Sequence, residues 1–333
     1  MFARETRFAL IGCGLIGRKR VTSLRHGQLA VVCDRDTARA NQLLETARSG
    51  RAINEVEEAI RDAEVDAVIV ATPNSFLAPI AKLAIAAGKH VLIEKPAAIS
   101  SSQITELLQL SASSSSCVRV GYNHRYHRAM QKAYELVRQG SAGPLMFLRA
   151  RYGHGGRLGY EREWRADPAI SGGGELIDQG VHLIDLASWF MGAEFTEVQG
   201  HTKTYFWDMP VEDNSFLSLQ TAAGQMAWLH ASCTEWKNMF SFEIYGRTGK
   251  LHIEGLGGSY GMERLTFYQM LPEMGPPKVL SWEFPGEDVS WKLEMDEFLQ
   301  DIRQSRVPVP GLQEALHTLG IVEKVYQQTG RSI

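Results

Sequence analysis

A glycine-rich turn near the start of the chain separates a strand-like segment from a helix-like one. Residues 8–11 are all apolar, residues 18–20 are all basic, and Gly12, Gly14 and Gly17 lie between them. Glycines with the spacing GxGxxG occur in many turns, but between a strand and a helix they form the turn that holds a pyrophosphate. The pattern therefore predicts an α/β domain that binds a dinucleotide at this turn.

Each part of the turn has its own physical role. Gly12 permits the tight turn, Gly14 lets the backbone approach the pyrophosphate, and Gly17 lets the helix pack closely on the strand. Leu15 and Ile16 open the helix, whose free N–H groups and partial positive charge attract phosphate. We therefore predict that these five residues bind the cofactor.

An acidic residue ends the second predicted strand. The run 29–33 is apolar, and Asp34 follows it at nearly the spacing of roughly 20 residues expected for the carboxylate that binds the ribose hydroxyls. A carboxylate there repels a 2′-phosphate and favours NAD, whereas an arginine such as Arg35 can hold that phosphate and favour NADP. The position of Asp34 favours NAD, and both residues are predicted to contact the cofactor.

Strand-like and helix-like segments continue to alternate through the first 122 residues. Mostly apolar segments of strand length occupy residues 65–71, 91–93 and 117–122, and a helix is expected over residues 79–87. Regular alternation of this kind is typical of a parallel sheet with right-handed crossovers. We therefore expect residues 1–122 to form a Rossmann dinucleotide-binding domain.

Polar residues follow two of these strands directly. Thr72, Pro73 and Asn74 come after the first of them, and Glu94 and Lys95 end the next. In an open α/β sheet, ligands bind beyond the carboxyl ends of the strands. All five are predicted to line the cofactor site, where Lys95 can also act on a substrate.

The second part of the chain has a different pattern. Segments with period-two alternation form two predicted hairpins, 215–220 with 225–230 and 242–245 with 250–253. Residues 123–333 are therefore expected to form an α+β domain with a large, mostly antiparallel open sheet that binds substrate. An uncovered apolar sheet face would suit a homodimer or homotetramer. Two closing helices, over 291–304 and 312–328, can pack back on the first domain.

An aspartate and a histidine follow a run of glycines in this second part. Asp178 and His182 are four residues apart in a segment whose apolar residues recur at helical spacing, so the two are predicted to share one helix face. A carboxylate beside an imidazole raises its basicity and can orient it. The alternative is a helix-terminal aspartate and a histidine at a packed surface.

The bulk composition excludes several classes of protein. With 22% charged residues and a net charge of −3 over 333 residues, the chain has no strong field for nucleic acid or an anionic membrane. The four cysteines are scattered, without the spacing of a metal site, and are expected to be reduced in a cytoplasmic protein. We expect neither a signal peptide nor a membrane-spanning segment, because no apolar run is long enough to span a membrane.

Together the motifs resemble the Gfo/Idh/MocA family, which includes glucose–fructose oxidoreductase and inositol dehydrogenases. The likeness covers nearly the whole chain. Besides the glycine turn it rests on Thr72-Pro73-Asn74, on Glu94-Lys95-Pro96, and on Gly173-Gly174 leading to Asp178 and His182. Family members commonly carry a histidine shortly after Thr-Pro-Asn, and residues 75–78 here lack it.

The resemblance implies a nicotinamide cofactor and hydride transfer at a secondary alcohol or ketone of a sugar, sugar nucleotide or cyclitol. It also implies that Lys95, Asp178 and His182 form the catalytic group. His182 can take the alcohol proton while Asp178 stabilises the imidazolium, and Lys95 can donate to the developing oxyanion. Which of Lys95 and His182 takes the proton is left open by the sequence.

Further residues are candidates for substrate binding. Asn123 and Arg125 follow the strand that ends the first domain, and the segment 152–165 is rich in glycine, aromatic residues and arginine. The full predicted set is Lys95, Asn123, Arg125, Tyr152, His154, Arg157, Arg165, Asp178 and His182. One hypothesis is that an arginine of the segment faces a substrate anion. The alternative is a solvated loop whose arginines pair with Glu161, Glu163 and Asp167.

Two other functions use the same fold. One is a dinucleotide-sensing regulator without catalysis, because a fold does not determine a function. The other is a glycosidase that uses NAD transiently and has a tyrosine base. A regulator has no need of Lys95, Asp178 and His182 together, and this chain has all three.

Overall fold

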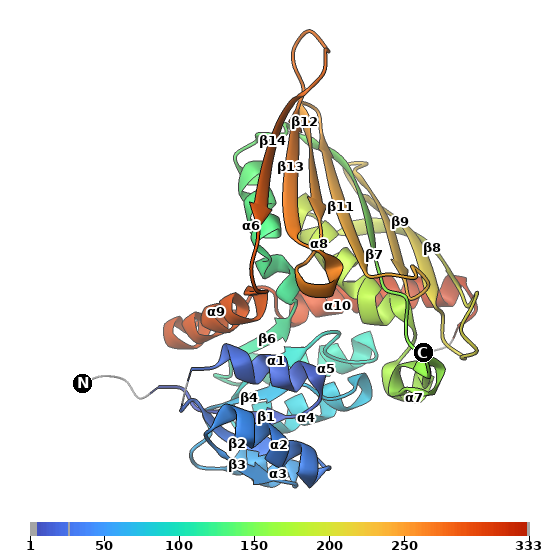
Figure 1. The fold of residues 1–333 in the computed structure, drawn as a ribbon. Helices are drawn as coiled ribbons and strands as arrows, with labels where there is room; N and C mark the ends of the chain where they lie inside the picture. Colours follow the sequence, from blue (N-terminus) through green and yellow to red (C-terminus); the bar gives the residue numbers. More distant parts are fainter. Residues whose placement is uncertain (1–4, 26, 332–333) are drawn as a thin grey trace. The chain divides into compact units, whose positions relative to one another are not determined.

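The computed structural model describes residues 5–25 and 27–331. The chain divides into two compact units, each with its own sheet (Figure 1). Unit 1 consists of residues 1–122 and 291–316, and unit 2 consists of residues 123–290 and 317–333. The segment from Trp291 to Leu316 thus folds with the first sheet although it lies near the end of the chain.

Unit 1 is built on a six-stranded parallel sheet in the order β3-β2-β1-β4-β5-β6. Its strands are β1 (Phe8–Ile11), β2 (Leu29–Cys33), β3 (Arg51–Ile53), β4 (Ala67–Val70), β5 (His90–Glu94) and β6 (Val118–Gly121). The order reverses between β1 and β4, which is the topological switch point at which ligands bind in doubly wound sheets. The predicted Rossmann architecture is confirmed.

Helices connect these strands in the predicted alternation. They are α1 (Leu15–Ser23), α2 (Thr37–Ala47), α3 (Val56–Arg61), α4 (Asn74–Ala86) and α5 (Ser101–Ala112). Helix α4 begins at Asn74, before the predicted start at Pro79, which lies inside it. The predicted start assumed that the proline lies in the first turn of the helix, where proline is best tolerated. The φ of proline is also compatible with the helix interior, and Pro79 lies there. Directly after β4, the polar residues Thr72 and Asn74 therefore stand at the start of a helix.

Helix α9 (Ser290–Gln304) completes the core of unit 1. Met295, Phe298 and Leu299 of α9 are buried in one cluster with strand residues that include Phe8 and Leu92. Polar contacts accompany this packing. The fully buried guanidinium group of Arg119 forms an ion pair with Asp301.

Unit 2 is built on an eight-stranded sheet in the order β14-β13-β12-β11-β7-β10-β9-β8. Its strands are β7 (Leu145–Gly153), β8 (Phe195–Lys203), β9 (Asn214–Thr221), β10 (Met226–Ser232), β11 (Met239–Gly246), β12 (Gly249–Glu254), β13 (Glu263–Gln269) and β14 (Lys278–Phe284). Both predicted hairpins are present as β9–β10 and β11–β12. The sheet is mixed, because β7 and β10 pair in parallel while the other neighbours are antiparallel.

Helices and short turns surround this second sheet. They are η1 (Asn123–Tyr126), α6 (Arg128–Arg138), η2 (Tyr160–Arg162), η3 (Trp164–Ala166), α7 (Pro168–Ser171), η4 (Leu176–Gly180), α8 (Val181–Met191), η5 (Gly258–Tyr260) and α10 (Leu312–Gln328). Helix α8 packs against β7 and β10 and is almost entirely buried. Since η4 leads directly into α8, the residues of η4 are held against the buried face of the sheet.

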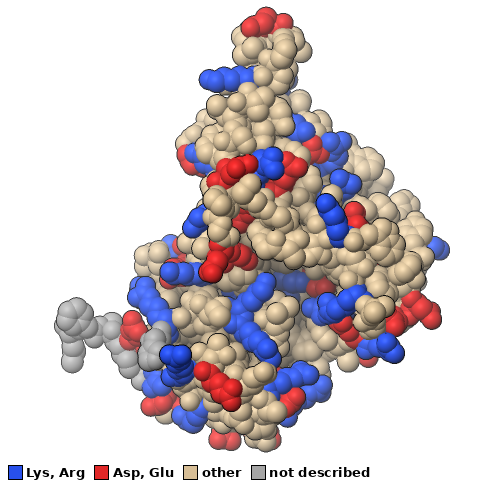
Figure 2. Space-filling view, in the orientation of Figure 1, with Lys and Arg blue, Asp and Glu red and all other residues tan. Residues whose placement is uncertain are grey.

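The exposed surface has no dominant charge. Figure 2 shows lysine and arginine side chains interspersed with aspartate and glutamate over the visible face, in agreement with the net charge of −3. None of the described helices is both long and apolar enough to cross a membrane. The surface therefore carries no large field of one sign that would attract a polyanion.

Candidate active site

Two glycines of the turn in unit 1 are required by packing. Gly12 has a φ of 99°, and a Cβ atom added there would lie 2.4 Å from the carbonyl oxygen of Ala71, just after β4. A Cβ atom at Gly17 would lie 2.0 Å from the carbonyl oxygen of Gly12. Both distances are far below a van der Waals contact. These glycines bring β1, β4 and α1 close together, as predicted.

Gly14 is different, because nothing within the protein requires a glycine there. Its φ is −72°, and no atom of the described chain lies within 4 Å of an added Cβ. Gly14 is the N-cap residue of α1, and none of the described side chains caps this helix. The first N–H groups of α1 therefore lie beside open space, which is the arrangement that accepts a phosphate.

A polar atom without a partner lies on the neighbouring strand end. The hydroxyl oxygen of Thr72 is buried and makes no hydrogen bond within the described part of the chain. Buried hydroxyl groups are nearly always hydrogen-bonded. Together with the open side of Gly14, this atom shows that the turn and the β4 end fit a dinucleotide.

The structure holds the Asp34 carboxylate at the end of β2. One of its oxygens accepts a hydrogen bond of 2.8 Å from the Cys13 N–H, within the glycine turn, and the other accepts one of 2.9 Å from the Asp36 N–H. Arg35 is exposed. The carboxylate is thus oriented by the turn itself, with its remaining lone pairs available for other donors.

Lys95 follows β5 immediately, and β5 is the neighbour of β4 in the parallel sheet. The glycine turn, Thr72 and Lys95 therefore follow the carboxyl ends of three adjacent strands, β1, β4 and β5. The preceding residue, Glu94, is buried and accepts a hydrogen bond of 2.5 Å from Arg20 of α1. Its carboxylate is used inside the unit, where it fixes the end of β5.

Replacing Gly14 with alanine is expected to weaken NAD binding by roughly tenfold, or about 1.4 kcal/mol, without loss of stability. The added methyl group meets no protein atom but would occupy space that the pyrophosphate approaches. Calorimetric titration with NAD and thermal unfolding measure the two effects. Gly17→Ala is the matched comparison, and it should lower the melting temperature because its methyl group collides with Gly12. Equal NAD affinity of wild type and Gly14→Ala would refute the assignment.

His182 in unit 2 lies in the first turn of α8, and its side chain is buried. Its ring stacks on that of His124, with 3.8 Å between the ring centroids. The ring of Tyr152 lies against both histidines, with its centroid 5.1 Å from the ring centroid of His124 and 6.1 Å from that of His182. These contacts fix the plane of the imidazole, which a group that exchanges a proton with a substrate requires.

Asp178 lies in η4, which is a π-helical turn. A π-turn is wider than an α-turn, and the expectation that Asp178 and His182 share one helix face stays a prediction. Asp178 accepts a hydrogen bond of 3.0 Å from Nε of Arg165. Burial opposes the charge of that guanidinium, but Asp178 prevails and raises the pKa of Arg165.

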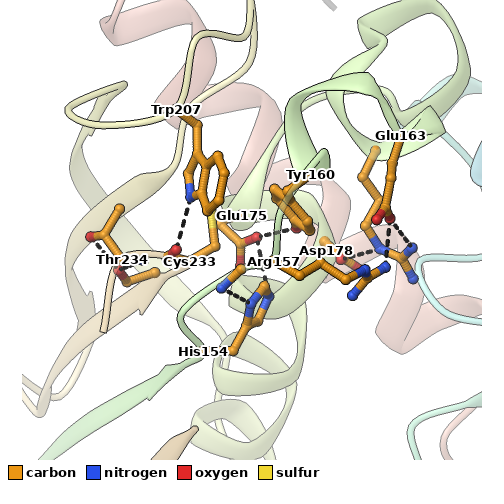
Figure 3. Close-up of polar contacts among 12 residues, drawn as sticks. His154, Arg157, Tyr160, Glu163, Glu175, Asp178, Trp207, Cys233 and Thr234 are labelled. Atoms are coloured by element: carbon orange, nitrogen blue, oxygen red, sulfur yellow. Dashed lines mark hydrogen bonds and ion pairs between the residues drawn. The ribbon is translucent and has the colours of Figure 1, made fainter. Parts of the chain in front are cut away.

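A second buried carboxylate lies three residues before Asp178. Glu175 accepts a hydrogen bond of 2.8 Å from the hydroxyl group of Tyr160, and Nε2 of His154 lies 3.6 Å from the same oxygen (Figure 3). On the other side of its ring, Nδ1 of His154 accepts a hydrogen bond of 3.0 Å from the Gly156 N–H. His154 thus ties the loop after β7 to η4.

The tyrosines of this region remain protonated at neutral pH. Burial raises the pKa of Tyr152 well above its ordinary value, with a further contribution from Tyr260, and raises the pKa of Tyr260 to about 12. Burial and Glu175 also raise the pKa of Tyr160. These three hydroxyl groups can donate hydrogen bonds, but none of them is a base near neutral pH.

Comparison with known proteins agrees with both halves of this description. A model of the oxidoreductase family with an NAD-binding Rossmann fold matches residues 6–122, and a model of the GFO/IDH/MocA C-terminal domain matches residues 130–252. The chain belongs to the Gfo/Idh/MocA family. This family membership confirms that the chain is an NAD-binding oxidoreductase.

Individual relatives align with nearly the whole chain. It is 28% identical to scyllo-inositol 2-dehydrogenase (NAD(+)) of Bacillus subtilis over 318 residues, which cover 92% of this chain and 88% of the relative. An oxidoreductase domain protein from Kribbella flavida has the same fold, with a TM-score of 0.88 at 21% identity and coverage of 98% and 97%. Levoglucosan dehydrogenase in complex with NADH and L-sorbose gives 0.85 at 20% identity, with 98% of both chains covered.

Two residues predicted to bind substrate have partners inside unit 2 of this oxidoreductase. Arg125 is buried and donates to both oxygens of Asp185, at 2.8 Å and 2.6 Å. Asn123 is also buried and donates to the hydroxyl group of Ser290 at 3.0 Å. Both side chains are held by these partners within unit 2. Their role in substrate binding stays a prediction.

The sequence reasoning did not select Glu175 or His124 as site residues. The sequence signals were weak: Glu175 merely follows the glycine run, and His124 is one of several polar residues after β6. No group of three or more His, Cys, Asp or Glu side chains within the described ranges could hold a metal ion.

Proposed function

We propose that this oxidoreductase is an NAD-dependent dehydrogenase or reductase that acts on a secondary alcohol or ketone of a sugar, sugar nucleotide or cyclitol. Unit 1 would bind the cofactor and unit 2 would bind the substrate. The relatives named above include an inositol dehydrogenase and a sugar dehydrogenase, which supports this class of substrate. The bound nicotinamide would carry the hydride.

The observation that carries the proposal is the position of Lys95. It follows β5 at the same sheet edge as the glycine turn after β1 and Thr72 after β4. A cofactor held by that turn would therefore lie along the strand ends that include Lys95. A lysine there can hold an alcohol oxygen and donate to the oxyanion that develops on it.

The alcohol proton needs a base, and the candidates are few. The raised pKa values of Tyr152 and Tyr260 exclude these hydroxyl groups. Among the other titratable groups, we propose that His182 and Lys95 both serve the same reaction. His182 is held in one ring orientation by His124, and the carboxylate of Asp178 is held by Arg165. Asp178 would stabilise the imidazolium that forms when His182 accepts the proton.

The preference for NAD over NADP follows from Asp34. Its carboxylate is fixed at the end of β2 by the Cys13 N–H and would repel a 2′-phosphate. Arg35 is exposed, and an arginine there can hold a 2′-phosphate or stack on the adenine; beside the Asp34 carboxylate we propose the second role. A lower dissociation constant for NAD than for NADP in calorimetry would support this preference, and the reverse order would refute it.

Two other functions are weaker readings of the same structure. A glycosidase that uses NAD transiently would need a tyrosine base, and the tyrosines near Asp178 keep their protons. A regulator that senses a dinucleotide would need neither the stacked His182 nor the ion pair of Asp178 with the partly exposed Arg165. Both observations favour the dehydrogenase.

The proposal is tested by mixing the full chain with NAD and a panel of inositols, hexoses and UDP-sugars. Absorbance of the reduced nicotinamide measures turnover, and the corresponding ketones with NADH test the reverse direction. We expect turnover with at least one member of the panel. Tight NAD binding without turnover of any substrate in either direction would favour the regulator instead.

We also propose that the chain forms a homodimer or homotetramer through the outer face of the second sheet. Phe147, Phe216 and Trp228 are exposed on β7, β9 and β10, which are neighbouring strands. Exposed aromatic residues on one sheet face are typical of a subunit interface. Trp228→Glu is expected to shift the sedimentation coefficient towards that of the monomer, whereas Trp228→Phe should not. A wild-type chain that sediments as a monomer would contradict the proposal.

A cytoplasmic location completes the proposal. All four cysteines are free and buried, as expected for a protein that folds in a reducing compartment. Fractionation of cells that express the chain would test this location, and recovery outside the cytoplasm would refute it.

A further inference from the structure

Four charged side chains of unit 2 form an alternating series that ends at Asp178. Arg157 donates to Glu163 at 2.6 Å, Nη1 of Arg165 lies 3.7 Å from the same carboxylate oxygen of Glu163, and Nε of Arg165 donates to Asp178 at 3.0 Å. Figure 3 shows Glu163 among these contacts. Two guanidinium groups are thus matched by two carboxylates, and the series as a whole is neutral.

This pairing changes what the two arginines can do. A guanidinium group has five N–H donors, so the carboxylate partners of Arg157 and Arg165 do not use up their donors, but they do match their charges. An arginine that attracts a substrate anion needs a positive charge that is not already matched. A substrate carboxylate that displaced Glu163 would exchange one ion pair for an equivalent one, so it would gain little. A substrate carboxylate that displaced Asp178 would leave a buried charge without its partner, which is unfavourable.

The surroundings of the series add negative charge. Glu175 is buried three residues before Asp178 and receives its hydrogen bond from Tyr160. Its second oxygen has no hydrogen-bond partner in the described part of the chain. An anionic group on a substrate near Asp178 would therefore meet a series without net charge and the carboxylate of Glu175, one oxygen of which lies 3.6 Å from Nε2 of His154. A hydroxyl group could accept from or donate to the same atoms without this repulsion.

We propose that Glu163 is a specificity-determining residue that makes this oxidoreductase select rings without charge. By neutralising Arg157 and Arg165, it would favour neutral hexoses and cyclitols over rings that carry a carboxylate or a phosphate. This inference rests on the proposed function, because it places the substrate beside Asp178. It replaces the hypothesis that an arginine of the segment 152–165 binds a substrate anion.

The wild-type protein gives the first test. We compare glucose with glucuronate and myo-inositol with its monophosphate, by kcat/KM and by calorimetric titration of the NADH-loaded protein. The neutral member of at least one pair should have a kcat/KM, and an affinity, at least about tenfold higher than the charged member. Equal or tighter binding of the charged member would overturn the inference. Absence of binding by all four compounds would also overturn it.

Glu163→Gln gives the second test, because it removes the charge and keeps the shape of the side chain. We expect this variant to lower the ratio of kcat/KM for glucose to kcat/KM for glucuronate by roughly fivefold, mainly through tighter binding of glucuronate. Glu163→Asp keeps the charge and should retain most of the wild-type ratio. Glu161→Gln is the matched control, because Glu161 has a similar exposure in the same loop and pairs with Arg162 instead.

The outcomes separate the inference from the function on which it rests. If glucose or inositol binds without turnover, the proposed dehydrogenase activity fails while the selectivity can still be read from the dissociation constants. If neutral and charged rings turn over equally well, the dehydrogenase stands and the role of Glu163 fails. An identical ratio for Glu163→Gln and Glu161→Gln would also refute that role.

Discussion

Replacing Lys95 with methionine is expected to lower kcat by roughly 10³-fold and to leave NAD affinity within a few-fold of the wild-type value. Lys95 follows β5 at the edge that carries the glycine turn, where its ammonium group would hold the substrate oxygen. Methionine keeps a long apolar stem but has no charge and no N–H donor. Steady-state kinetics with the best substrate of the panel measures kcat, and calorimetry measures the NAD dissociation constant.

The control for this prediction is Lys82→Met. Lys82 lies on α4 of the same unit, is exposed, and donates to Glu106 at 3.0 Å. Removing its charge should leave kcat near the wild-type value, because its partner Glu106 is another exposed surface side chain. Near-full turnover by Lys95→Met would eliminate the role that we assign to Lys95.

The pH dependence of kcat/KM distinguishes the two candidate bases. If His182 accepts the alcohol proton, the acidic limb of the profile belongs to an imidazole and should persist in Lys95→Met. The same limb should then be lost in His182→Asn, whose residual activity no longer depends on imidazole ionisation. Loss of the limb in Lys95→Met alone would assign the proton to the lysine instead.

Much of the fold could be predicted from the sequence because its signals are local. The glycine turn, the alternation of strands with helices, and the two hairpins depend on residues that are near neighbours in the chain. The pairing of β7 shows what such local signals cannot predict. Its parallel pairing with β10 depends on contacts between distant segments, and a period-two pattern fits a parallel and an antiparallel neighbour equally.

The candidate site also has a part that could be predicted from local sequence signals and a part that depends on contacts between separate segments. The glycine turn of the cofactor half is one contiguous motif, so its glycines could be predicted from spacing alone. The substrate half depends on which carboxylate each arginine reaches, and several acidic residues were close in sequence. Arg165 pairs with Asp178 and Arg125 with Asp185. The π-turn at η4 widens one turn of the helix, which a count of four residues from Asp178 to His182 does not reveal.

Arg20 is the clearest case of a residue whose role the sequence conceals. In the sequence it is one of three basic residues at the start of a helix. In the structure it is fully buried and lies between two carboxylates, with hydrogen bonds of 2.5 Å to Glu94 and 2.6 Å to Glu294. Glu294 comes from α9, far along the chain. The ion pairs thus join the first helix, the end of β5 and a late helix within unit 1.

Arg20→Met is expected to destabilise the protein by about 3–5 kcal/mol, because it leaves two buried carboxylates without their cation. Urea unfolding followed by circular dichroism measures the loss. The matched control is Arg18→Met on the same helix, where the exposed guanidinium donates to Gln42. Its effect should stay within about 0.5 kcal/mol. The double variant Arg20→Met with Glu294→Gln should recover part of the loss, because one of the two buried charges is then absent.

The buried group of Arg20, Glu94 and Glu294 also predicts how the free energy of unfolding depends on pH. Burial, reinforced by Glu94 and opposed by Arg20, raises the pKa of Glu294 from 4.5 to about 6. The folded protein therefore retains this proton at pH values where the unfolded chain has lost it. Its contribution to stability is complete below pH 4.5 and is lost as the pH rises through about 6. Glu294→Gln should remove this pH dependence, which unfolding curves across that range would detect. If Arg20→Met and Arg18→Met had the same free energy of unfolding, the ion pairs of Arg20 with Glu94 and Glu294 would not stabilise the fold.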